Sequence, residues 1–225
     1  MRLMHPIFSA PLDFTESNSH TVVIESPDEL YRMLKTLLAQ IEGEPGDFIY
    51  SKDYEPVEIF KKIELITNPL HLDWSNRTLQ NKLQRVLEKI AISEDHYLRT
   101  NRILSAIEAY GSVIIEDVAL PVEMCNEIDL TKLIKLLEVT FITDTKCLAE
   151  ELIEYIKLVK DMTDISCFMI VNISNFINNE SLIEFQKNME YEHINVLYLE
   201  AAFKEEVWKC PVRIYDKDLC EIELS

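Results

Sequence analysis

Glycine is almost absent from this chain, and its scarcity is the strongest constraint on what the chain can fold into. Only Gly43, Gly46 and Gly111 occur among the 225 residues. A phosphate-binding P-loop and a dinucleotide fingerprint both need glycines at fixed spacing, because the backbone must approach the phosphates closely. A nucleophile elbow and an EF-hand loop also depend on glycine. The sequence therefore excludes these sites and most nucleotide chemistry.

The chain is strongly acidic. Its 40 Asp and Glu side chains outnumber 22 Lys and Arg side chains, which gives a formal net charge of −18. A protein that coats nucleic acid with a uniformly basic surface is therefore excluded. Any contact with phosphate must come from a local basic face, a bound cation, or both.

Short apolar runs alternate with amphipathic helices toward both ends of the chain. Ser26-Pro27-Asp28-Glu29 has the pattern of a helix start, with Ser26 as N-cap and Glu29 completing a capping box. We expect strands at 20–25, 63–66, 139–142, 167–171 and 195–199, and helices at 26–41, 130–137, 148–159 and 180–191. This alternation predicts an α/β head, a mostly parallel sheet wrapped by helices, over residues 1–70 and 130–225.

Residues 71–129 show a different pattern. One helical stripe of apolar residues ends near Ile90, and Ser93 starts a second helix that continues through Ile114. Pro121 ends this region. Two long helices joined by a short turn predict a helical hairpin, inserted into the α/β head as a helical leg.

The cysteines indicate a reducing compartment. Their number is five, and no two form a Cys-x-x-Cys pair. We expect no signal peptide and no membrane span, hence a cytoplasmic protein with free thiols. Cys147 and Cys167 lie in apolar sequence and are expected to be small core residues.

Charge is distributed unevenly along the helical leg. Residues 77–102 are locally basic, whereas 103–131 contain no Lys or Arg. The basic residues of the first stretch are Arg77, Lys82, Arg85, Lys89, Arg99 and Arg102, and Lys132 with Lys135 forms a second basic group. The acidic stretch carries Glu108, Glu116, Asp117, Glu123, Glu127 and Asp129.

Two interpretations of this charge pattern remain open. Both stretches are consistent with solvated faces of amphipathic helices. Alternatively, the basic residues neutralise DNA phosphates, which makes binding independent of sequence and sensitive to salt. The carboxylates would then hold a hard divalent cation, with Ca²⁺ favoured because it accepts six to eight oxygen ligands in loose geometry.

No catalytic constellation stands out in the sequence. The five histidines are scattered without the spacing of a zinc site. Carboxylate-rich nucleases exist, so hydrolysis is not excluded by composition, but no acid or base is singled out.

The order of several segments resembles the CRISPR-associated Csn-two family, small adaptation proteins of type II-A systems. The similarity extends over nearly the whole chain and includes no catalytic motif. It rests on the strand-to-helix segment His20–Leu38, Ile63-Glu64-Leu65-Ile66-Thr67, Asn126-Glu127-Ile128 with Leu133-Ile134-Lys135, Ile170-Val171-Asn172, and Asn195-Val196-Leu197-Tyr198-Leu199-Glu200.

This resemblance implies a homotetrameric ring that binds double-stranded DNA ends without reading their sequence. Each subunit would have a degenerate NTPase-like head and a leg stabilised by Ca²⁺, with basic side chains lining the ring. The family supports spacer acquisition beside the CRISPR integrase and the effector nuclease, and it is not known as an enzyme. Missing phosphate-loop glycines agree with such a head.

The resemblance also suggests calcium ligands. Glu127 matches the acidic segment of the family best and Glu123 is plausible, while Glu116, Asp117 and Asp129 are nearby candidates. Asn126 and Lys132 stand where the family has acids, so we expect that calcium binds more weakly here or is replaced by a contact of Lys132.

Three functions follow from these observations. The first is a non-enzymatic DNA-end-binding ring, which the resemblance favours. The second is a carboxylate-dependent nuclease, for which a divalent metal would convert binding into cleavage. The third is an acidic adaptor that binds proteins and no DNA.

Overall fold

The computed structural model describes residues 1–124 and 128–224, and it divides into two compact units. Met1–Leu72 and Thr143–Ser225 form one unit, here called the α/β unit. Asp73–Ile142 form the other, here called the helical unit, which is inserted between the two halves of the first. None of the described helices combines the length and the apolarity that crossing a bilayer requires.

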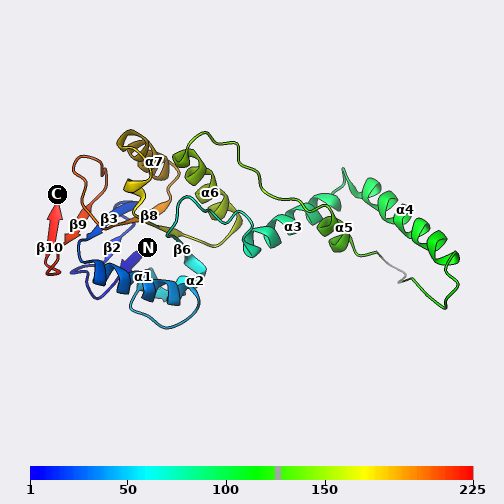
Figure 1. Ribbon diagram of the computed structural model, residues 1–225, viewed down its shortest axis with the longest axis horizontal. Helices are drawn as coiled ribbons and strands as arrows, with labels where there is room; N and C mark the ends of the chain where they lie inside the picture. The colour runs from blue at the N-terminus through cyan, green and yellow to red at the C-terminus, as the bar shows by residue number, and fades with distance from the viewer. Residues whose placement is uncertain (125–127, 225) are drawn as a thin grey trace. The chain divides into compact units, whose positions relative to one another are not determined.

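A six-stranded sheet forms the centre of the α/β unit (Figure 1). Its strand order is β10-β9-β3-β8-β7-β6, with all neighbours parallel except β10 and β9. The strands are β3 (Ser19–Ile24), β6 (Ile63–Ile66), β7 (Cys167–Val171), β8 (Asn195–Glu200), β9 (Val212–Tyr215) and β10 (Glu221–Leu224). The predicted class, a mostly parallel sheet in an α/β fold, is confirmed.

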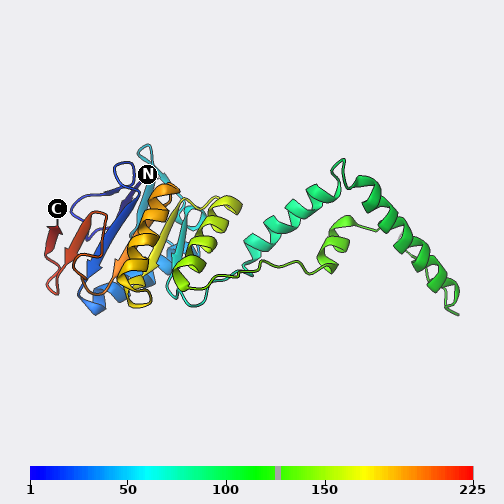
Figure 2. The same cartoon turned by 90° about the horizontal axis from the view of Figure 1, so that it is seen from above.

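Helices cover both faces of this sheet (Figures 1 and 2). Helix α1 (Pro27–Ile41) covers one face, where its buried residues Met33 and Leu37 share a core cluster with Met169 of β7 and Leu197 of β8. The other face carries α6 (Leu148–Met162) and α7 (Asn179–Tyr191), where Phe185 meets Tyr198 edge to face. Coverage on both sides explains why β7 is apolar at every position.

The start of α1 is capped as the sequence predicts. Ser26 is the N-cap, and its side-chain oxygen accepts a hydrogen bond from the Glu29 backbone N–H at 3.5 Å. Pro27 occupies the first turn, where its missing N–H leaves no helical bond unmade. The orphan donors at this helix end are therefore partly satisfied from within the chain.

A second, antiparallel sheet was not predicted from the sequence. Its order is β2-β1-β4-β5, and its buried residues join the core on the α1 side. The strands have two to four residues each: β1 (Arg2–Met4), β2 (Leu12–Asp13), β4 (Ile49–Lys52) and β5 (Glu55–Val57), followed by the short helix α2 (Ile59–Lys62). A short 3₁₀ turn, η1 (Ile173–Asn175), follows β7.

The helical unit contains α3 (Arg77–Ala91), α4 (Tyr97–Glu116) and α5 (Leu130–Leu136). Helix α3 packs on α5, and in the described part of this unit only Leu79 and Ile134 are buried. From the sequence we expected the leg to end at residue 129, which would leave α5 in the α/β head. In the structure α5 contacts α3, so it belongs to the helical unit, which ends at Ile142.

Three expectations differ from the structure. Residues 139–142 form no strand, because no neighbouring strand pairs with them, and Ile142 is 91% exposed. Cys147 is exposed at the start of α6, so only Cys167 is the predicted core cysteine. The packing partner of α3 is α5, so the expected hairpin of α3 and α4 is replaced by that pair.

Two buried histidines predict how stability depends on pH. Burial lowers the pKa of His5 and of His20 below the ordinary value. The folded protein therefore keeps both rings neutral, while the unfolded chain binds protons as the pH falls through about 6.5. The contribution of the two neutral histidines to the free energy of unfolding is therefore fully present above this pH. Below it, the free energy of unfolding declines by at most about 1.4 kcal/mol per pH unit for each histidine.

Urea unfolding between pH 7.5 and 5.5, followed by far-ultraviolet circular dichroism, measures this loss. His5→Asn keeps an acceptor for the Ile7 N–H, which lies 3.3 Å from His5 Nδ1, and should reduce the pH dependence. The matched control is the exposed His96→Asn. Identical pH dependence in wild type and His5→Asn would contradict the prediction.

Candidate nucleic-acid interface

Helix α3 carries a basic stripe. Asn76 caps its start by accepting a hydrogen bond from the Thr78 N–H at 2.8 Å. Lys82, Arg85 and Lys89 follow at spacings of three and four residues, which places them on one side of the helix. The stripe is about 10 Å long, a length over which duplex DNA carries about six phosphates.

Packing of α3 leaves this stripe accessible. Leu79 is buried, and the apolar side of α3 meets α5 near Ile134. Arg85 and Lys89 are exposed, and Lys82 is half-buried. An amphipathic helix that buries its apolar side in this way presents its charged side to solvent.

The other predicted basic residues lie on all three helices of the unit. Arg77 begins α3, Arg99 and Arg102 lie one turn apart on α4, and Lys132 and Lys135 lie one turn apart on α5. All five are exposed. Helices α3 and α5 pack together, so the structure brings the α3 and α5 groups onto one pair of helices.

The basic side chains of the helical unit lack ion-pair partners in the described part of the chain. None of the eight forms an ion pair with a residue that the structure describes. Glu88, the acid within the stripe, instead accepts a hydrogen bond from Gln84 at 2.7 Å. These ammonium and guanidinium groups are therefore free to contact phosphate.

Helix α4 exposes apolar side chains along its whole length. No residue of this 20-residue helix is buried. Its large exposed apolar residues are Tyr97, Leu98, Ile103, Ile107, Tyr110, Val113 and Ile114. A helix that is apolar on several sides normally lies inside a larger assembly. From the sequence we expected a second helix here, but we assigned no role to its apolar residues.

The chain after α4 folds back beside this helix. A Cβ on Gly111 would lie 2.6 Å from Met124 Sδ, so glycine lets the methionine side chain lie close to the helix. The Ile128 N–H donates a hydrogen bond to Glu108 Oε1 at 3.3 Å. These two contacts hold Met124 and Ile128 against α4.

The structure does not gather the predicted metal ligands. Glu116 ends α4, Asp117 is its C-cap, and Glu123 is exposed in the following segment. Asp129 caps α5 and accepts a hydrogen bond from the Thr131 N–H at 2.9 Å, while Glu127 lies outside the described residues. Within residues 1–124 and 128–224, no three His, Cys, Asp or Glu side chains are placed to hold a metal ion.

One feature of this segment nevertheless favours a cation. Glu116 and Asp117 lie at the C-terminal end of α4, and the last turn has no basic residue. The helix macrodipole makes this end negative, so two added carboxylates are unfavourable there until a cation compensates them.

Acidic side chains lie at the carboxyl edge of the six-stranded sheet. Nucleotides bind at this edge in related architectures, with phosphate at a helix N-terminus. Here the first turn of α1 carries Asp28 and Glu29. At the end of β8, Glu200 accepts hydrogen bonds from Ser174 N at 3.2 Å and Ser174 Oγ at 2.6 Å, and burial raises the pKa of Glu200.

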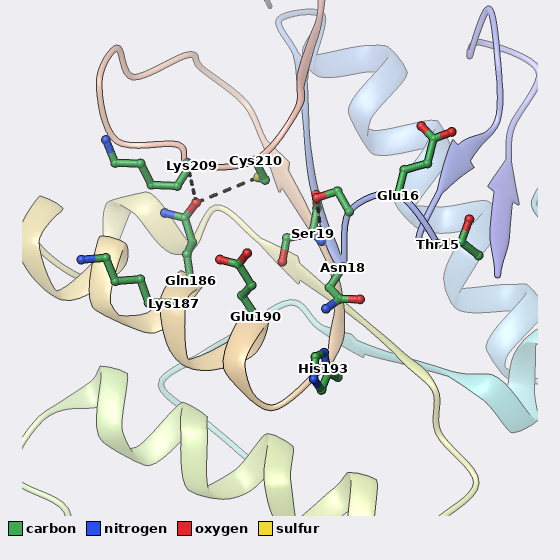
Figure 3. Close-up of a pocket in the computed structure, with 11 residues that line it drawn as sticks. Thr15, Glu16, Asn18, Ser19, Gln186, Lys187, Glu190, His193, Lys209 and Cys210 are labelled. Atoms are coloured by element: carbon green, nitrogen blue, oxygen red, sulfur yellow. Dashed lines mark hydrogen bonds between the residues drawn. The ribbon is translucent and has the colours of Figure 1, made fainter.

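A polar pocket of about 320 Å³ lies at the opposite, amino edge of the sheet, where Ser19 begins β3 (Figure 3). Gln186 Oε1 accepts a hydrogen bond from Lys209 N at 2.9 Å and lies 4.0 Å from Cys210 Sγ. Burial raises the pKa of Cys210 to about 11, so its thiol is protonated and weakly nucleophilic at neutral pH. The two acids and two lysines of the lining, Glu16, Glu190, Lys187 and Lys209, favour no single ligand charge.

Comparisons with known proteins add independent information. A sequence model of the family described as CRISPR-associated protein (Cas_Csn2) matches residues 40–219. Stu0660 of Streptococcus thermophilus, known from a crystal structure, is similar with a TM-score of 0.65 and 13% sequence identity. That match covers 100% of this chain and 76% of the other, and it shows a shared fold. No curated protein sequence matches. The family match includes the whole helical unit.

Proposed function

Since the chain belongs to the Cas_Csn2 family of CRISPR-associated proteins, we propose that it binds the ends of double-stranded DNA without reading their sequence. In this proposal it acts as a non-enzymatic homotetrameric ring that supports spacer acquisition. Family membership carries the CRISPR-associated role. The observation that carries DNA binding is the set of eight basic side chains on the helical unit that form no ion pair with a described residue, in a chain with net charge −18.

The distribution of charge supports this use of the helical unit. Lys82, Arg85 and Lys89 offer a linear row of cations to a linear row of phosphates. Such contacts position DNA but carry no sequence information. One stripe gives weak binding, whereas four stripes around a shared hole add their fields and restrict escape.

The exposed apolar residues of α4 support self-assembly. Burying them in contacts between copies removes apolar surface from water at about 25 cal/mol per Å². The symmetry of a homotetramer lets one such helix serve several identical contacts.

Calcium is part of the proposal as a stabiliser of the helical unit. Glu116 and Asp117 at the negative end of α4 would supply oxygen ligands, with Glu123, Glu127 and Asp129 as further candidates. Because the described residues of one chain do not converge on a site, we propose that binding draws these carboxylates together. A bound Ca²⁺ would supply charge compensation at this helix end.

The remaining parts of the proposal concern partners and location. We propose that the ring works with the CRISPR integrase and the effector nuclease in the cytoplasm. The four described cysteines are free thiols, which is the usual state in a reducing compartment.

Reversing the α3 stripe tests the DNA proposal. The triple variant Lys82→Glu, Arg85→Glu, Lys89→Glu should weaken retention of linear duplex DNA by at least about tenfold, because attraction to phosphate becomes repulsion. Gel shift at two salt concentrations measures retention, and light scattering after size exclusion checks that the oligomer is intact. The matched control is Lys187→Glu, Lys209→Glu, Lys217→Glu on the α/β unit.

Unchanged retention in the α3 variant would remove the stripe from the interface. DNA cleavage after addition of Mg²⁺ or Mn²⁺ would favour the nuclease hypothesis instead. If the wild type retains no DNA at physiological salt, the adaptor hypothesis would replace both.

A second prediction concerns assembly. Tyr110→Glu with Ile114→Glu places two charges on the apolar surface of α4, and burying them without partners is unfavourable. We expect the variant to sediment as a smaller species with unchanged α/β secondary structure. Tyr191→Glu, at a residue of the α/β unit that is 82% exposed, is the control. A full-size oligomer in the α4 variant would contradict the role of this helix.

A third prediction concerns calcium. Isothermal titration should detect Ca²⁺ uptake, and Ca²⁺ should raise the melting temperature. Glu116→Gln with Asp117→Asn should abolish both effects, because these substitutions remove the carboxylate charges at the end of α4. Glu180→Gln with Glu184→Gln on α7 is the charge-matched control. Absence of uptake by the wild type would eliminate calcium from the proposal.

A further inference from the structure

The α/β unit has a second cavity, a groove of about 340 Å³ beside the C-terminal end of α1. Its lining includes the buried residues Phe48, Tyr50 and Ile59. The lining also includes Ile49 and Phe60, which are 53% and 45% exposed. Large apolar side chains are thus exposed beside buried apolar residues, which is typical of a surface that receives an apolar group.

The groove is preformed. The Gln40 side chain reaches the Phe48 backbone with both ends of its amide: Nε2 donates to Phe48 O at 3.0 Å, and Oε1 accepts from Phe48 N at 2.9 Å. A Cβ on Gly46 would overlap the Gln40 side chain, so glycine lets the connecting loop pass close to it. The loop after α1 is therefore held in place, and little ordering is needed when a partner binds.

The rim of the groove is acidic. Glu44 and Glu58 line it, and Glu42 and Asp47 belong to the same loop as Glu44. Glu58 pairs with Lys61, whereas Glu42, Glu44 and Asp47 have no ion-pair partner among the described residues. Glu44 in the lining, together with Glu42 and Asp47 of the same loop, attracts cations and repels DNA.

Binding here does not depend on strand addition. Strand β5 is the edge of the small sheet, and it has three residues with Pro56 in the middle. Proline lacks the N–H that an added strand would need, and short edge strands with proline resist pairing. Recognition must therefore come from side chains that enter the groove.

We infer that this groove is a docking site for a basic segment of a partner protein. One bulky apolar side chain of the segment lies between Ile49 and Phe60, and its flanking Lys or Arg side chains contact Glu42, Glu44 and Asp47. The inference goes beyond the proposed DNA binding, because it concerns another surface and another class of partner. Charge complementarity selects a basic occupant over nucleic acid.

Synthetic peptides test this inference. The probe is a fluorescein-labelled peptide with one phenylalanine between two pairs of arginines, and its binding is followed by anisotropy. Two matched peptides replace the phenylalanine by serine or the arginines by glutamates. We expect the first peptide to bind, the serine peptide to bind about tenfold more weakly, and the glutamate peptide not to bind.

Variants of the protein locate the binding. Phe60→Ser, Ile49→Ser and Glu44→Lys should each weaken the arginine–phenylalanine peptide by about fivefold or more. Ile222→Ser and Glu180→Lys are matched controls at exposed residues outside the groove, and both should bind the peptide like the wild type. All variants should retain linear DNA, so failure of the groove and failure of the DNA proposal are distinguishable.

Three results would overturn the inference. The first is absence of peptide binding by the wild type. The second is binding that the groove variants and the controls weaken equally, which would reflect the overall negative charge. The third is dissociation of the oligomer in Phe60→Ser or Ile49→Ser, which would assign the groove to a second copy of the chain.

Discussion

Burial of both faces of the six-stranded sheet is the interaction on which the rest of this structure depends. Helix α1 covers one face and α6 with α7 covers the other, so the α/β unit has its own core. The described part of the helical unit buries only Leu79 and Ile134. That unit therefore carries most of its apolar residues on the surface, and this difference in packing supports the proposed role in assembly.

Many proteins with an open, mostly parallel sheet bind nucleotides through a glycine-rich loop, and the scarcity of glycine in this chain excludes such a loop. Where such proteins place phosphate at a helix N-terminus, this chain has Ser26, Pro27 and two acids at the start of α1. At the end of β8, the Glu200 carboxylate accepts hydrogen bonds from the backbone N–H and the hydroxyl of Ser174, donors that could otherwise contact a phosphate. Hydrogen-bond donors at the carboxyl edge of the sheet are thus satisfied by side chains of the protein itself. The basic side chains considered for phosphate contact lie instead on α3, α4 and α5.

Much of the α/β fold could be predicted from the sequence, because strands such as 167–171 are apolar throughout and helices such as α1 have clear caps. The small sheet was missed since strands of two to four residues show no periodicity. Residues 139–142 have strand composition but no pairing partner, which only the tertiary structure reveals. For the candidate interface, the sequence located the basic residues, but packing on α5 decides which side of α3 is accessible. The sequence also identified the acidic residues, but it does not show whether they come together in a metal site, because this depends on the conformation of the loop that carries them.

The way the helical unit is attached has a mechanical consequence. The chain leaves the α/β unit after β6 and returns to it before α6, so any pull on the helical unit is transmitted through these two elements. Strand β6 is the outermost strand of its sheet and has only β7 as a hydrogen-bonded neighbour, over four residue pairs. Under tension, this ladder is the first part of the sheet to bear load, and in the proposed DNA-binding role its rupture force would limit how firmly the protein holds a moving duplex.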